Sequence, residues 1–202
     1  MNRRTLLLSA AAVPLAAAVP ARAEPVSLPD ISAYLNGVRS AESRFTQFNA
    51  DGSVSTGKVV IVRPNRMRFD YDPPEETLVL ASGGQVAIFD PKSNQPPEQY
   101  PLKRTPLNLI IGARIDLSRA KMVVGHGEEG EMTTVTAQDP DNPEYGTIKL
   151  YFTRDPVALR EWIVTDDSGQ ETRVTLDELV EGGDYPTSLF SISMEIERRG
   201  LN

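Results

Sequence analysis

The sequence contains no cysteine, one histidine and one tryptophan in 202 residues. Without cysteine the chain has no disulfide bond, no thiolate nucleophile, no cysteine-ligated metal and no lipid-modified N-terminal cysteine. Basic residues are also scarce, with 21 Lys+Arg against 28 Asp+Glu and a formal net charge of −7. An acidic chain without a basic stripe is a poor candidate for binding nucleic acid or an anionic membrane surface. We therefore expect no nucleic-acid partner.

Residues 1–23 contain the one long apolar run of the chain. The pair Arg3-Arg4 precedes this run, which ends at small residues, and this order is typical of a secretory signal peptide. A membrane anchor is the alternative, but Pro14 and Pro20 interrupt the run and its core is short for a bilayer. We expect cleavage after this segment and export to the periplasm, by the twin-arginine or the general secretory route. Residues 24–202 then remain as a single domain.

The first helix is predicted where apolar residues recur at helical spacing. Tyr34, Leu35 and Val38 follow Ile31 at the i+3, i+4 and i+7 positions, which places them on one face. A second, short helix begins at residues 105–107 and ends at Gly112, with few apolar side chains of its own.

The rest of the chain shows the period of two that indicates β-strands. The predicted strands are Phe45–Phe48, Gly57–Val62, Arg66–Tyr71, Thr77–Ala81, Gln85–Phe89, Met122–Gly125, Met132–Ala137, Thr147–Phe152, Leu159–Thr165, Thr172–Leu176 and Leu189–Ile192. Ten to twelve strands at hairpin spacing favour one meandering antiparallel sheet that curls. The residues after Glu195 are polar and either add a strand or hang free.

Catalytic and metal-binding patterns are missing. His126 lies between two glycines, so we interpret it as a solvated turn residue rather than a catalytic base. The acidic segment Asp139–Glu144 does not match the spacing of a calcium loop, and its prolines stiffen it. The sequence has no G-x-S-x-G elbow, phosphate loop or dinucleotide fingerprint. We expect a binding or carrier protein that is not an enzyme and has no cofactor and no metal.

The segment Arg63–Tyr71, followed by Pro73-Pro74, resembles the LolA family of periplasmic lipoprotein carriers. Further segments agree in the same order, namely Phe45-Thr46-Gln47, the hairpin Ser82–Phe89, Thr105–Leu107 and Leu189-Phe190. The resemblance covers essentially all of residues 24–202. It implies a mainly β fold, an unclosed antiparallel β-barrel with a lid of short helices over its concave apolar face.

The same resemblance implies a function and a set of site residues. Such carriers take triacylated lipoproteins from an inner-membrane ABC exporter to an outer-membrane receptor. Arg63 matches the arginine that holds the lid shut in the family. On this reading the acyl-chain cavity is formed by Met67, Phe69, Tyr71, Leu107, Ile110 and Trp162, and the apolar face of the lid helix by Tyr34, Leu35 and Val38. Met67 replaces a residue that is often aromatic in the family.

The residues themselves allow a second interpretation. Arg63 shares strand parity with Met67, Phe69 and Tyr71 if Pro64 introduces no bulge, which places an arginine at the rim of an apolar stripe. The alternative is that Arg63 forms a surface ion pair and that the stripe is ordinary core.

Two other functions are compatible with parts of the pattern. A lipid- or lipoprotein-binding envelope sensor could use the same half-barrel, although such sensors usually have a second domain. A hydrolase of envelope lipids would need a nucleophile and a base, which a lone histidine between glycines does not provide. We expect the carrier to act as a monomer.

Overall fold

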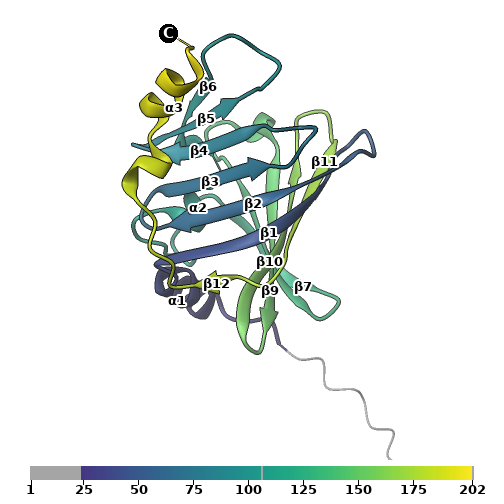
Figure 1. The fold of residues 1–202 in the computed structure, drawn as a ribbon. Helices are drawn as coiled ribbons and strands as arrows, with labels where there is room; N and C mark the ends of the chain where they lie inside the picture. Colours follow the sequence, from purple (N-terminus) through teal and green to yellow (C-terminus); the bar gives the residue numbers. More distant parts are fainter. Residues whose placement is uncertain (1–23, 106, 202) are drawn as a thin grey trace, which may run out of the picture.

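The described residues form one sheet of twelve antiparallel strands that curls without closing (Figure 1). The structure is a computed structural model that describes residues 24–105 and 107–201. The predicted signal peptide, residues 1–23, lies outside the described residues, as do Pro106 and Asn202. This architecture confirms the predicted fold class.

The strands follow one another in a simple meander. Their bounds are β1 Ser40–Phe48, β2 Val54–Val62, β3 Arg66–Tyr71, β4 Leu78–Ser82, β5 Gln85–Phe89, β6 Glu98–Pro101, β7 Val123–Glu129, β8 Met132–Gln138, β9 Thr147–Arg154, β10 Val157–Thr165, β11 Glu171–Leu176 and β12 Val180–Glu181. The order in the sheet is β6-β5-β4-β3-β2-β1-β11-β10-β9-β8-β7, and β12 also pairs with β1. The edges β6 and β7 are not paired with each other, so the barrel is open between them.

Short helices occupy both faces of this sheet. Their bounds are α1 Leu28–Gly37, η1 Leu102–Arg104, α2 Asn108–Ile111, η2 Pro143–Tyr145, η3 Thr187–Phe190 and α3 Ile192–Arg199. In Figure 1, α2 lies behind the strands β2–β5, whereas α3 lies in front of them. No helix of the described part of the chain is long and apolar enough to cross a membrane.

Strand parity determines which side chains face the inside of the curl. In β3, Met67 and Phe69 are buried in the main core, while Arg68 points to the opposite face. The ring of Phe45 on β1 lies across Gly57 on β2, where a Cβ atom would come within 2.5 Å of that ring and 2.3 Å of the Asp70 carbonyl oxygen. Gly57 therefore makes room for an aromatic ring on the concave face.

The C-terminal residues cover the convex face, and the predicted last strand at Leu189–Ile192 is wrong. These residues span the end of η3 and the start of α3 instead. Apolar side chains of α3 and of the residue that follows its C-cap pack against a second cluster on β4 and β5 (Leu78, Leu80, Ala87 and Phe89 against Ile192, Ile196 and Leu201). The tail thus neither adds a strand nor hangs free.

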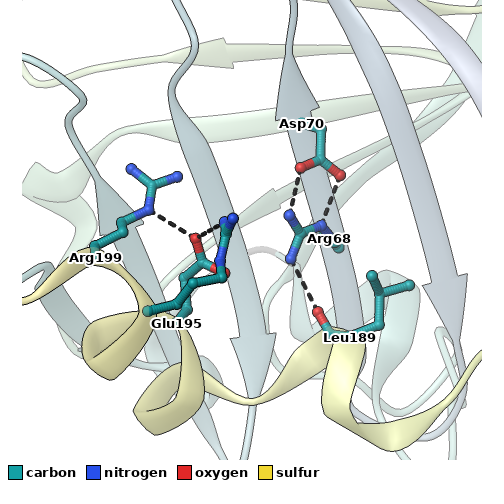
Figure 2. A network of polar contacts seen from close by, with 6 residues as sticks. Arg68, Asp70, Leu189, Glu195 and Arg199 are labelled. Atoms are coloured by element: carbon teal, nitrogen blue, oxygen red, sulfur yellow. Dashed lines mark hydrogen bonds and ion pairs between the residues drawn. The ribbon is translucent and has the colours of Figure 1, made fainter.

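Charged side chains attach η3 to the sheet and form ion pairs within α3 (Figure 2). Arg68 forms two hydrogen bonds to the Asp70 carboxylate and donates a third, of 3.0 Å, to the Leu189 carbonyl oxygen. Glu195 is buried, which disfavours its charge, yet hydrogen bonds from Arg198 and Arg199 outweigh burial and lower its pKa. Apolar packing therefore holds the C-terminal helix on the sheet, and the ion pairs stabilise the helix itself.

Two further predictions from sequence need correction. The strands β6 and β12 were not predicted, and they are short and exposed, so they show little apolar alternation. His126 was expected in a turn, but it lies within β7, where flanking glycines remain extended.

Candidate functional site

The helix α1 covers one end of the concave face. Ser27 caps its N-terminus by accepting a hydrogen bond from the backbone N–H of Asp30. Leu35 and Val38, predicted as the apolar face of this helix, are 3% and 7% exposed. The third predicted residue, Tyr34, is partly buried and meets Phe152 edge to face at 6.4 Å between ring centroids. Its hydroxyl accepts a 3.2 Å hydrogen bond from the Leu159 backbone, and burial raises its pKa.

The helix α2 and the residues after it cover the neighbouring part of the same face. Of the two predicted cavity residues here, Ile110 is 3% exposed and Leu107 is partly buried against the core. Four more side chains from this region enter the same core cluster (Leu109, Ile111, Ile115 and Leu117). We call α1, α2 and residues 112–117 together the lid.

The sheet presents an aromatic surface to the lid. Trp162 on β10 is 5% exposed and meets Phe69 on β3 edge to face at 6.1 Å. Phe45 contacts both Phe69 and Tyr71 in the same manner, at 5.5 Å and 5.0 Å. The Tyr71 hydroxyl donates a 2.7 Å hydrogen bond to Gln47, and burial raises its pKa to about 12. Met67 completes this surface at 1% exposure. The predicted cavity residues of the sheet thus lie together under the lid.

Arg63 connects the lid to the sheet. It lies in the turn between β2 and β3, not in β3 itself, because β2 ends at Val62 and β3 begins at Arg66. The condition for strand parity with Met67 is therefore not met, because a turn at residues 63–65 separates the two strands, although Arg63 still borders the apolar pocket beside Ile61. Its Nη2 donates to the Gly112 carbonyl oxygen at 2.7 Å and to Asn36 Oδ1 at 3.0 Å. Gly112 is the C-cap of α2, so Arg63 binds the end of a lid helix.

Asn36 is the lid residue that the sequence did not reveal. Its Nδ2 donates to the Ile115 carbonyl oxygen at 2.7 Å, and its Oδ1 accepts from the Ile115 N–H at 3.1 Å and from Arg63. Nearby, Ser32 accepts a 3.0 Å hydrogen bond from the Leu117 N–H. These contacts join α1 to the segment after α2, and we call Arg63, Asn36 and Gly112 the latch.

The N-terminal approach to α1 is also attached to the sheet. The Val26 N–H donates to Thr133 Oγ1 on β8 at 2.9 Å, and His126 Nε2 on β7 lies 2.9 Å from the Val26 carbonyl oxygen. His126 therefore joins the edge of the sheet to the segment that leads into the lid.

Little free space remains between the lid and the sheet. A pocket bordered by Leu35, Ile61, Arg63 and Ile110 has a volume of about 10 Å³, enough for roughly one water molecule. The concave face is thus filled by apolar side chains of the lid. In residues 24–105 and 107–201, no group of three acidic or histidine side chains is placed to hold a metal ion.

Comparison of the sequence with known proteins identifies the family. Residues 36–193 match the family model of the outer membrane lipoprotein carrier protein LolA. The outer-membrane lipoprotein carrier protein of Azotobacter vinelandii is 29% identical over 182 residues, which is 85% of this chain and 84% of that protein. The protein of the same name from Leptothrix cholodnii is 30% identical over 166 residues, or 78% and 76% of the two chains. By its sequence, this chain belongs to the LolA family.

Proposed function

We propose that this protein shields the acyl chains of lipoproteins on its concave face and carries them through the periplasm. One observation supports this proposal above all. The apolar surface of the sheet is covered by side chains of a separate lid, and few hydrogen bonds attach that lid to the strands. A cover of this kind can be displaced by an apolar ligand that makes equivalent contacts.

The energy of lipid transfer explains why a lid is needed. Burial of a methylene group is worth about 0.8 kcal/mol, so three chains of about fifteen methylenes each represent roughly 35 kcal/mol against water. No lipoprotein crosses an aqueous compartment at that cost. A carrier surface nearly as apolar as the bilayer makes the exchange almost neutral. When empty, that surface has to be covered, because a large exposed apolar patch promotes aggregation.

The lid has to move for cargo to bind. The pocket of about 10 Å³ cannot hold an acyl chain, so the chains take the place of lid side chains such as Leu35 and Ile110. When cargo binds, contacts between lipid and sheet replace the contacts between lid and sheet. The free energy of closure opposes loading and assists release, because binding is weakened by the fraction of molecules that are closed.

The proposed route runs from the inner membrane through the periplasm to the outer membrane. Residues 1–23 would direct the chain to the periplasm, where an inner-membrane ABC exporter supplies triacylated lipoproteins and an outer-membrane receptor accepts them. The protein would perform no covalent chemistry on its cargo. This fits the position of His126, whose ring nitrogen contacts a backbone carbonyl oxygen rather than a nucleophile.

Native mass spectrometry tests this function. Residues 24–202 are mixed with a synthetic triacylated lipopeptide or with the same peptide lacking its acyl chains. We expect a one-to-one complex with the acylated peptide alone, and the lipopeptide should be released with its mass unchanged. Equal binding of the two peptides, or no binding of either, would contradict the carrier function. A cleaved lipopeptide would indicate a hydrolase instead.

A further inference from the structure

Arg63 has hydrogen-bond donors that the closed lid does not use. A guanidinium has five N–H donors. In Arg63, Nη2 alone makes both hydrogen bonds of the side chain, one to Asn36 and one to the Gly112 carbonyl oxygen. The Nε and Nη1 atoms are buried without any partner. Burial also lowers the pKa of Arg63. Arg154 offers a contrast, because it too has a buried free Nε but pairs with the carboxylate of Glu128. No ion pair of Arg63 occurs within the described residues.

The residue that holds these unused donors borders the small apolar pocket under the lid. Arg63 is the one charged side chain that lines this pocket, and its neighbours there include Leu35, Ile61 and Ile110. A buried donor without an acceptor is costly, and more so when it is charged. A ligand that entered this pocket with an acceptor oxygen would remove that cost.

We propose that Nε and Nη1 of Arg63 bind an ester carbonyl oxygen of the acylated cargo. The inference rests on the proposed carrier function and adds a polar specificity contact to it. An acyl chain is apolar along its length but ends at a carbonyl group, which is an acceptor without a donor. Arg63 borders the pocket together with Ile61, whose partner on β3 is Met67, so it lies at the end of the apolar surface where the head of a bound chain would lie.

The contact would make the carrier prefer acyl chains over plain hydrocarbon chains, which burial of apolar surface alone does not do. Apolar surface accepts any hydrocarbon of suitable shape, whereas a buried donor pair favours ligands that carry an acceptor at the matching place. Arg63 would then serve two partners in turn through different atoms, the closed lid through Nη2 and, once the lid has moved, the cargo through Nε and Nη1.

The test compares two synthetic lipopeptides with the same chain lengths. One has ester-linked O-acyl chains and the other has ether-linked O-alkyl chains, which lack the carbonyl oxygens. Dissociation constants are measured by fluorescence titration of Trp162, the single tryptophan. We expect the wild-type protein to bind the ester form about tenfold more tightly, the effect of one charge-assisted hydrogen bond. Arg63→Leu should bring the ratio of the two constants to about one.

Asn36→Ala is the matched control. It loosens the same latch but leaves the free donors of Arg63 in place, so the preference for the ester form should persist. Equal binding of both forms by the wild-type protein, or an unchanged preference in Arg63→Leu, would overturn the inference while leaving the carrier function intact. Failure of the wild-type protein to bind either lipopeptide would overturn both.

Discussion

Arg63→Leu and Asn36→Ala are each expected to loosen the lid of the cargo-free protein about tenfold. Each substitution removes hydrogen bonds that join α1 or α2 to their surroundings, and a net loss of about 1.4 kcal/mol corresponds to a factor of ten. Amide hydrogen exchange within Leu28–Gly37 and Asn108–Ile111 measures this opening. Exchange in α3, which packs against β4 and β5 on the opposite face of the sheet, serves as the internal reference.

The double variant shows whether the two residues act as one latch. Because Arg63 and Asn36 share a hydrogen bond, their effects should be less than additive. Asn36→Ala should also hold a triacylated lipopeptide more tightly and pass it on more slowly, since closure competes less with cargo. Unchanged exchange in both single variants would show that these two side chains do not hold the lid closed.

Gly57→Ala is expected to cost about 3 kcal/mol of unfolding free energy. The added Cβ would lie 2.3 Å from the Asp70 carbonyl oxygen and 2.5 Å from the ring of Phe45. The first contact is with backbone in a paired strand, and the ring is 1% exposed and packed against Phe69 and Tyr71, so neither can move freely. Overpacking of this kind costs about 1–3 kcal/mol. Thermal unfolding should show a Tm lower by roughly 10 °C.

Gly127→Ala provides the control for this substitution. Gly127 also lies in a strand, but a Cβ atom there would meet nothing within 4 Å. We expect its unfolding free energy to change by less than about 0.5 kcal/mol. Equal stability of the two variants would mean that the concave face is not packed as described.

Much of the sheet was predictable because its signals are local. The alternation of apolar and polar residues in β3 assigned Met67 and Phe69 to one face. Gly83 and Gly84 marked the turn between β4 and β5. The short helix before Gly112 was likewise found from turn and cap residues. The curl of the sheet was expected from the number of strands, since large antiparallel sheets twist or close.

The latch and the C-terminal helix depend on contacts between distant segments. Asn36 meets Ile115 across 79 positions, and nothing near Asn36 distinguishes it from any polar residue at a helix end. In α3, Ile192 and Ile196 are spaced by four, but Ile192 was assigned to a last strand and the charged residues from Glu195 onward resembled a polar tail. The apolar side of α3 becomes evident only when its partner is known, which is the apolar cluster on β4 and β5 that the helix buries.

The most direct test of a carrier with a lid is whether acyl chains reach the concave face of the sheet. Trp162 lies on that face, 5% exposed beneath the lid, and it is the single tryptophan of the chain. A lipopeptide with brominated acyl chains should therefore quench most of the tryptophan emission on binding, while its unbrominated counterpart should not. Tight binding of the brominated lipopeptide without quenching would place the lipid elsewhere and contradict a carrier that shelters its cargo under the lid.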